Sequence, residues 1–267
     1  MQNFTGAFEE NYIEESITIL TASLNEVQNI GKWINEVLEI RAKMHLTPIT
    51  EIVIVDDGSK DGTQDKILAI AEKSPIEIKL VQRHSKLGTL NAQITGAINS
   101  SSNYILVMDC DLQHPIEYIP HFLAQMKNKP DIVIGSRYIE GGANRWSPYR
   151  GIVSRTATFL SHVLLKNSRN VSDPLSGYFL IKRALLRSLK PYSGMYKPLL
   201  FAISSYTDLH TIEIPITMEN RMEGESKIVN NPMRVILSYI REILVFWKNS
   251  RKFSISELSF EFSDSPD

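Results

Sequence analysis

The sequence has one cysteine, Cys110, among its 267 residues, so no internal disulfide bond can form. This scarcity suits a reducing compartment. Net charge is also nearly absent: the formal value of -1 at pH 7 gives no general attraction to nucleic acid, and no nucleic-acid partner is expected. Residues 1–15 contain neither a basic side chain nor a long apolar run, so we expect no signal peptide and a cytoplasmic location.

The chain is rich in short apolar runs that alternate with helical patterns. With 43% hydrophobic residues it can bury one large core with a modest appendage. The alternation predicts an α/β fold, a mostly parallel sheet with helices on both faces. We expect strands near residues 16–20, 51–55, 76–82, 105–108, 131–135 and 211–217, and helices near 27–44, 89–98, 116–126 and 152–165. Pro215 interrupts the hydrogen-bonding ladder of the last strand, which predicts an edge position.

Two carboxylates, Asp109 and Asp111, follow directly on the buried run 105–108. In open α/β sheets, ligands bind at the carboxyl ends of the strands. Two aspartates this close repel each other unless a cation lies between them, and a hard divalent cation with oxygen ligands answers that need. Gln113 adds a neutral oxygen. Cys110, between the carboxylates, is expected to stay protonated and is not a candidate nucleophile.

A second acidic pair, Asp56 and Asp57, ends the strand near 51–55 and enters a turn with Gly58. One interpretation is a turn followed by a helix cap. Two carboxylates at this edge nevertheless cost desolvation and repulsion, so contact with ribose hydroxyls or a base edge would explain them better.

Taken in order, these segments resemble those of family 2 glycosyltransferases, and more narrowly the branch of dolichol-phosphate mannose synthases and bacterial polyprenyl-phosphate transferases. The resemblance spans roughly residues 16–227. The motifs that carry it are Leu24-Asn25-Glu26, Val55-Asp56-Asp57-Gly58-Ser59, Asp61-Gly62-Thr63, Lys86-Leu87-Gly88-Thr89, Met108-Asp109-Cys110-Asp111-Leu112-Gln113-His114-Pro115, Gly135-Ser136-Arg137-Tyr138, Asp173-Pro174-Leu175-Ser176-Gly177 and Gly224-Glu225-Ser226-Lys227.

The resemblance implies the GT-A fold, which binds nucleotide-diphospho-sugars, and an inverting transfer of a hexose. It implies mannose from GDP-mannose as the donor sugar and a polyprenyl phosphate as the acceptor. Mg²⁺ or Mn²⁺ would be held by Asp109, Asp111 and Gln113. By the same resemblance, Glu26, Asp56, Asp57 and Asp109 would bind the nucleotide, and Arg137, Arg150, Ser154, Arg221 and Lys227 would bind donor and acceptor phosphates. Asp109, Asp111 and Arg137 would carry the catalysis.

The acceptor class follows from the chemistry that each acceptor needs. A sugar hydroxyl needs a carboxylate base to take its proton. A phosphate monoester is already ionised near pH 7 and needs positioning, to which the arginine fork is suited. Asp173 is a possible base, although a structural turn before Pro174 is the favoured interpretation. A transferase that acts on a sugar hydroxyl in cell-surface polysaccharide synthesis stays as the alternative.

The expected organisation is an N-terminal extension over residues 1–15, a GT-A catalytic domain over 16–231, a C-terminal amphipathic helix over 232–252 and an acidic tail over 253–267. The apolar stretch of that helix is shorter than the roughly 20 residues that span a bilayer. Two interpretations stay open: packing on the catalytic domain, which is favoured, or lying at a membrane surface with Arg241, Lys248, Arg251 and Lys252 toward anionic lipid. The expected location is therefore peripheral, at the cytoplasmic face of a membrane.

Two other protein classes fit less well. A signalling receiver domain also has an acidic pair after a strand, but that pair follows its first strand, and much of the chain beyond Pro115 would be unexplained. A nucleotide-sugar-binding protein without turnover is compatible with the fold. The presence of Asp109, Asp111, Arg137 and Lys227 gives it no support.

Overall fold

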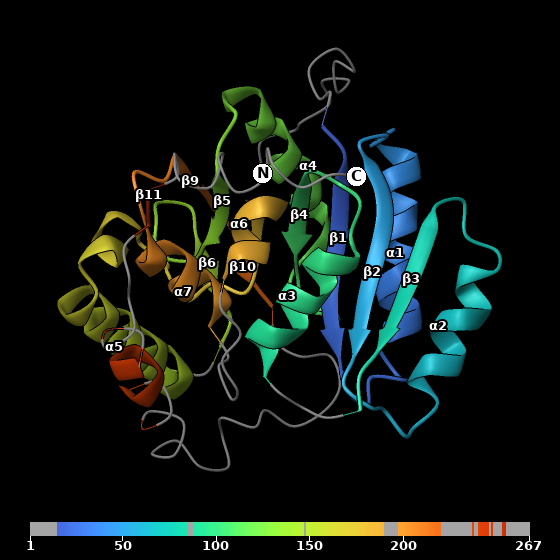
Figure 1. The fold of residues 1–267 in the computed structure, drawn as a ribbon, viewed down its shortest axis with the longest axis horizontal. Coiled ribbons are helices and arrows are strands. Elements are labelled where there is room, and N and C mark those ends of the chain that lie inside the picture. The colour runs from blue at the N-terminus through green and yellow to red at the C-terminus, as the bar shows by residue number, and fades with distance from the viewer. Residues whose placement is uncertain are drawn as a thin grey trace.

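The structure is a computed structural model that describes residues 15–84, 88–146, 148–189, 197–219, 237, 240–245, 247 and 253–254. Its centre is a seven-stranded sheet in the order β3-β2-β1-β4-β7-β5-β9 (Figure 1). The strands are β1 (Ile17–Ser23), β2 (Ile49–Asp56), β3 (Glu77–Gln82), β4 (Tyr104–Val107), β5 (Ile132–Ser136), β7 (Phe179–Lys182) and β9 (Thr211–Pro215). All six strands predicted from the sequence are present.

Strand β7 is the exception in a sheet that is otherwise parallel. It runs antiparallel to both β4 and β5, between which it lies. Strand β9 is at the edge and ends at Pro215, as the missing proline N–H predicted. Two short pairs lie outside the main sheet: β6 (Ala143–Asn144) with β10 (Thr217–Met218), and β8 (Tyr206–Thr207) with β11 (Phe253–Ser254).

Helices cover both faces of the sheet. One face carries α1 (Ile30–Lys43), α2 (Thr63–Ala71) and α4 (Ile119–Ala124), and the other carries α3 (Thr89–Asn99), α5 (Pro148–Leu164), α6 (Arg183–Ser188) and α7 (Pro198–Ser205). Short 3-10 turns, η2 (Ile116–Tyr118) and η3 (Gln125–Asn128), flank α4 where the sequence predicted one continuous helix, and η4 (Lys166–Asn170) follows α5.

Successive side chains of each central strand enter different core clusters. In β4, Ile105 and Val107 pack with the cluster that contains α3 and α7 residues, while Leu106 packs with the cluster that contains α1 and α4 residues. All of them are at most 1% exposed. Because neither face of the strand meets water, the sequence of the strand is a continuous apolar run and not an alternating one.

The predicted C-terminal helix is described only at residues 237, 240–245 and 247, where the chain is helical. Ile243 is 1% exposed and joins the same core cluster as Ala157 of α5, so this face packs on the rest of the chain. Leu244 and Trp247 of the same segment are 47% and 62% exposed, so part of its apolar surface stays open to solvent. Within the described part of the chain, no helix has both the length and the apolar character needed to cross a bilayer.

Candidate active site

Five loops meet at one edge of the sheet. Strands β1, β2 and β4 are mutually parallel, so the loops that follow them emerge on the same side. Strand β5 has the same direction because it is antiparallel to β7, which is antiparallel to β4. For that reason the segment before β7, which contains Asp173, also reaches this edge. The sheet therefore gathers residues from distant parts of the sequence where α/β sheets bind ligands.

The loop after β4 presents the candidate metal ligands. The side chain of Asp109 is 56% exposed, whereas Asp111 is 5% exposed and accepts a hydrogen bond from the Gln113 N–H at 3.1 Å. Leu112 between them has a φ of +61°, a left-handed conformation that tightens the turn. Gln113 Nε2 donates to the carbonyl of Glu219, which orients the amide. One exposed carboxylate, one buried carboxylate and one amide oxygen form a hard donor set.

This donor set suits a cation that is also bound by a substrate. Mg²⁺ usually takes one or two carboxylates and completes its shell with water and substrate phosphates. Among the described residues, no three His, Cys, Asp or Glu side chains are grouped so that they could hold a metal ion. The residues fit a cation shared with a diphosphate.

His114 supports the first of these carboxylates, a role that the sequence did not reveal. Its ring is 2% exposed and stacks on Tyr178, with 5.0 Å between the ring centroids. The Asp109 N–H donates to His114 Nδ1 at 2.8 Å, so the proton of the neutral ring is on Nε2, which is 4.0 Å from Asp109 Oδ2. Burial lowers the pKa of His114, although the carboxylates of Asp109 and Asp111 oppose that shift. The neutral ring therefore holds the backbone of Asp109 through Nδ1, while the 4.0 Å between Nε2 and Oδ2 is longer than a hydrogen bond.

Cys110 behaves as the sequence predicted. It is buried, and its Sγ is 3.8 Å from the carbonyl oxygen of Ala22. Burial raises its pKa far above the usual range, and the charges of Glu26, Asp111 and Asp109 add to that effect. The thiol is therefore a buried packing group between the end of β1 and the loop after β4.

Arginine and aromatic side chains alternate beside the metal residues. The guanidinium of Arg150 is 3.9 Å from the ring centroid of Trp146, and that of Arg137 is 4.8 Å from the same centroid. Arg137 is also 5.1 Å from the ring of Tyr138. Arg150 Nη2 donates to Gln113 Oε1 at 3.4 Å, a long bond that links this group to the metal residues. Three residues predicted from different motifs, Gln113, Arg137 and Arg150, therefore belong to one site.

Ser154 joins the same site through Tyr138, whose hydroxyl donates to Ser154 Oγ at 2.8 Å. Both Ser154 and Arg150 belong to α5, one turn apart, so they face the same direction. The positions predicted to bind phosphate are thus carried by the end of β5 and the first turns of α5.

Asp173 has a task that neither sequence interpretation contained. It is fully buried, and its two oxygens accept hydrogen bonds from Arg137 Nε and Nη2, both at 2.6 Å. The Arg137 N–H also donates to it at 3.0 Å. This bidentate pair fixes the arginine and occupies one edge of its fork, so a phosphate contact by Arg137 would use the Nη1 side. A carboxylate enclosed in this way is poorly suited to act as a base.

The loops after β1 and β2 are tied to each other. The Asn25 N–H donates to Ser59 Oγ at 2.8 Å, and the Lys60 N–H donates to Asn25 Oδ1 at 3.0 Å. The Glu26 N–H donates to Thr63 Oγ1 at 3.0 Å, and Asn29 Nδ2 donates to the Glu26 carboxylate at 2.9 Å. The predicted nucleoside residues from these two loops are therefore held in one unit.

Within that unit Asp56 and Asp57 differ. Asp56 is fully buried, and both of its oxygens accept hydrogen bonds, from Ser59, Gln64 and Ser23 among others. Burial would raise the pKa of Asp56, but these hydrogen bonds outweigh it and hold the pKa below its usual value. This geometry favours a loop-shaping role over nucleoside contact. Asp57 forms an ion pair with Arg83, with 3.0 Å between Oδ1 and Nε.

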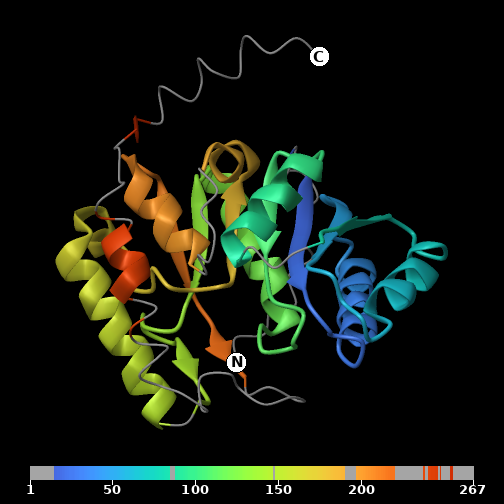
Figure 2. The ribbon, with the colours of Figure 1, turned by 60° about the horizontal axis from the view of Figure 1, so that its bottom comes forward.

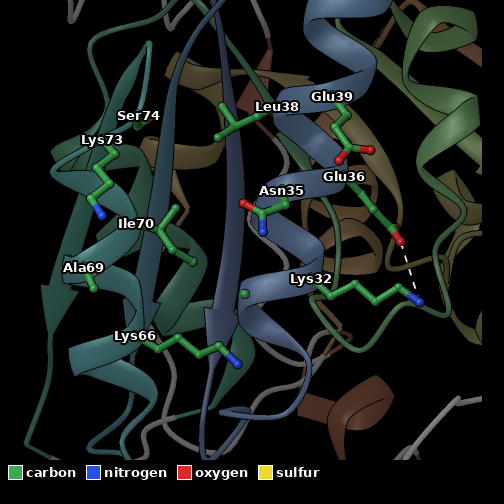
Figure 3. A pocket seen from close by; sticks show the side chains of 11 residues that line it. Lys32, Asn35, Glu36, Leu38, Glu39, Lys66, Ala69, Ile70, Lys73 and Ser74 are labelled. Atoms are coloured by element: carbon green, nitrogen blue, oxygen red, sulfur yellow. Dashed lines mark ion pairs between the residues drawn. The ribbon is translucent and has the colours of Figure 1, made fainter.

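A groove elsewhere on the surface contains none of these residues. It runs between α1 and α2, where Lys32 and Glu36 form an ion pair at 3.7 Å, and Lys66 and Lys73 line the opposite side (Figure 3). The groove follows the helix sides and not the strand ends. Two predicted phosphate ligands, Arg221 and Lys227, lie outside the described residues, as does the motif Gly224-Glu225-Ser226-Lys227.

Comparison with known proteins identifies the family of the chain. The family model described as glycosyl transferase family 2 matches residues 18–190. The chain is 31% identical over 250 residues to a dolichol-phosphate mannosyltransferase of Pyrococcus furiosus, covering 91% of this chain and 68% of the relative. It is 28% identical to the protein of the same name from Saccharomyces cerevisiae, covering 74% of this chain and 75% of that one.

Among solved structures, the chain is similar to glucosyl-3-phosphoglycerate synthase of Mycobacterium tuberculosis. One such structure, with Mn²⁺ and UDP-glucose, has a TM-score of 0.63 at 19% identity and covers 88% of this chain and 80% of that one. At this identity the likeness concerns the fold, which is the expected GT-A type. From the family model and the relatives together, the chain belongs to glycosyl transferase family 2 and is a glycosyltransferase.

Proposed function

We propose that the enzyme transfers a hexosyl group, mannosyl from GDP-mannose, to the phosphate of a polyprenyl lipid of the dolichol type. The observation that carries this proposal is that the guanidinium groups of Arg137 and Arg150 both lie over the ring of Trp146, and that Arg150 also contacts Gln113. Planar guanidinium groups bind phosphate through a fork of N–H donors. Two of them next to the metal residues suit a reaction in which a second phosphate, that of the acceptor, meets a diphosphate donor.

The state of Asp173 supports a phosphate acceptor over a hydroxyl. An attacking hydroxyl requires a base, and both Asp173 oxygens are engaged by Arg137 in a buried pair. A phosphate acceptor is already a nucleophile near pH 7, so the protein only has to orient it. Arg150 and Ser154, one turn apart on α5, are the residues we assign to that orientation.

The donor is assigned to the tied loops after β1 and β2 and to the loop after β4. Glu26 and Asp57 would contact the nucleoside, while Asp56 keeps the loop in shape. Asp109, Asp111 and Gln113 would hold Mg²⁺ or Mn²⁺ against the diphosphate. When bound, such a cation stabilises the negative charge that develops on the departing nucleotide. His114 would orient Asp109 through its Nδ1 contact with the backbone.

The relatives support the identity of the two substrates. Three matched proteins carry the name dolichol-phosphate mannosyltransferase, at 28–31% identity. The more distant synthases were solved with Mn²⁺ and UDP-glucose, which supports a divalent cation and a nucleotide-sugar.

Exposed apolar side chains support a membrane surface as a further partner. The C-terminal helical segment lies beside α5 (Figure 2). On α5, Ile152 and Phe159 are each 64% exposed, and on the C-terminal segment Leu237 and Trp247 are 60% and 62% exposed. Large apolar residues with this exposure on two adjacent helices are typical of an interfacial contact. A lipid acceptor would reach the site from that side.

The test is a donor screen with purified protein, Mg²⁺ or Mn²⁺, and a short-chain polyprenyl phosphate, following release of free nucleotide with and without the lipid. We expect GDP release from GDP-mannose that depends on the lipid. Donor binding without lipid-dependent release would move the assignment to a hydroxyl acceptor, and absence of donor binding would contradict the proposal.

A further inference from the structure

A second basic cleft lies along α5. It shares Tyr138 with the candidate active site, but its lining contains none of the residues assigned above to the donor, the acceptor or the metal. This α5 cleft is an open hollow of about 450 Å³ between α5 and the segment 169–172. Its lining includes Tyr138, Arg155, Thr158, His162 and Arg169, with Ser172 at the end. Its arginine and hydroxyl side chains can donate hydrogen bonds, and none of the cleft-lining residues that the structure describes is acidic.

The two arginines of the α5 cleft have no carboxylate partner among the described residues. Arg155 is exposed and stacks over the ring of Tyr138, with 5.3 Å from its guanidinium carbon to the ring centroid. Arg169 donates through Nε to the carbonyl of His162 at 2.6 Å and through Nη2 to that of Val163 at 3.2 Å. It therefore neutralises the negative end of α5, which would otherwise repel an anion.

The side chain of Thr158 offers the α5 cleft a buried hydroxyl that is available to a ligand. The residue is 7% exposed and lines the cleft, yet its Oγ1 has no hydrogen-bond partner among the described residues. A buried hydroxyl without a partner is costly, and most such groups in folded proteins are satisfied. The carboxylate of Glu213 accepts the N–H groups of Ser172 and Asp173 at 2.8 and 3.2 Å, and Glu213 does not line the cleft.

We propose that the α5 cleft is a second phosphate-binding site, separate from the diphosphate position at Asp109 and Asp111. Arg155 and Arg169 provide charge, and the Thr158 hydroxyl provides a directed hydrogen bond. His162 lines the cleft beside them, with its Nε2–H donated to the carbonyl of Val171 at 2.9 Å. Arg155 is three residues from Ile152 and four from Phe159, so it shares a helix face with exposed apolar side chains. The phosphate can therefore come from a lipid headgroup, whose tail would cover that face, or from a soluble phosphate monoester.

The experiment follows the ring C–H resonances of His162 in the full chain, assigned with His162→Gln. Methyl phosphate and dihexanoyl phosphatidic acid, a phosphate monoester with short tails used below its micelle concentration, are titrated separately. We expect a saturable shift of these resonances. Arg155→Gln should weaken binding by roughly tenfold, the loss typical of a hydrogen bond to a charged group, and Thr158→Val by about threefold. Tighter binding of the lipid would identify a headgroup site, and equal binding a site for soluble phosphate.

Two controls make the result specific. Arg187→Gln removes the same charge from an exposed position on α6 and should leave binding unchanged. Arg150→Gln perturbs the proposed acceptor position and should also leave the His162 response unchanged, which separates this site from the proposed function. No saturable shift with either ligand, or equal affinity in Arg155→Gln and the unmodified chain, would overturn the proposal.

Discussion

Replacing Asp173 with asparagine should destabilise the protein strongly, because it leaves a buried positive charge without its partner. Arg137 is 7% exposed and Asp173 is fully buried, with two contacts of 2.6 Å between them. Breaking a buried pair by removing one partner costs about 3–5 kcal/mol, and asparagine keeps one acceptor oxygen, so we expect about 3 kcal/mol. For a chain of this size that corresponds to a melting temperature lower by roughly 6–12 °C.

The assay is thermal unfolding of Asp173→Asn beside a matched control, Asp131→Asn. Asp131 also pairs with a cation, Lys182, at 2.8 Å, but the side chain of Lys182 is 40% exposed and water can solvate it after the change. The control should therefore lose less than half as much stability. A loss below about 1 kcal/mol in Asp173→Asn, or equal losses in both variants, would refute the account of this buried pair.

The same variant separates the two interpretations of Asp173. If Asp173 were a catalytic base, the variant would lose turnover at temperatures where it is fully folded. If Asp173 only fixes Arg137, turnover at such temperatures should fall partially, with the larger effect on stability. Turnover measured well below the melting temperature distinguishes them.

Three further predictions concern the site and the sheet. Asp111→Ala should lower turnover by on the order of 100-fold or more, as expected when electrostatic stabilisation of the leaving group is lost, and steady-state kinetics with Mg²⁺ would measure it. Arg137→Lys keeps the charge but loses the fork, so turnover should fall by about tenfold. The third prediction concerns Glu51. Burial raises the pKa of this carboxyl, but hydrogen bonds from Lys79, Thr18, Ser101 and Ser100 outweigh burial and hold the pKa at about 2, below the ordinary 4.5. Because this carboxyl has a lowered pKa in the folded state, its contribution to stability is complete above about pH 4.5 and is lost as the pH falls toward about 2. In denaturant unfolding across that pH range, the stability of Glu51→Gln should depend less on pH than that of the unmodified chain.

Each of these predictions has a matched control. Asp65→Ala removes an exposed aspartate from α2 and should keep turnover normal. Arg187→Lys makes the same exchange at an exposed position on α6 and should also leave turnover unchanged. Glu77→Gln alters a carboxylate that is 60% exposed and also pairs with Lys79, and it should keep the pH dependence. Near-normal turnover in Asp111→Ala or in Arg137→Lys would contradict the roles assigned to these residues. An unchanged pH dependence of stability in Glu51→Gln would contradict the account of Glu51.

The sequence predicted the parts of the fold that local patterns determine. Residues 52–55 of β2 and 105–107 of β4 are apolar without interruption because both faces of the strands are covered, and Pro215 marked the edge strand. The direction of a strand, in contrast, cannot be predicted from its local sequence pattern. The segment that forms β7 has no local feature that specifies an antiparallel position between β4 and β5, because that choice depends on packing of the whole sheet.

The site divides in the same way. The position of Asp109, Asp111 and Gln113 at the sheet edge was predictable because they follow a buried strand, and such edges bind ligands. The pair of Arg137 with Asp173 was not, because 36 residues separate its members and only the direction of β7 brings them together. The contacts of His114 and the stack on Trp146 likewise depend on side-chain geometry that no spacing rule encodes.

The most direct test of the central claim is the ³¹P NMR spectrum of a reaction that contains the enzyme, GDP-mannose, Mg²⁺ and a short-chain polyprenyl phosphate. Our account predicts that the phosphate monoester signal of the lipid decreases while a phosphodiester signal grows, in step with the appearance of GDP. Consumption of the donor with an unchanged lipid monoester signal would contradict transfer to a lipid phosphate.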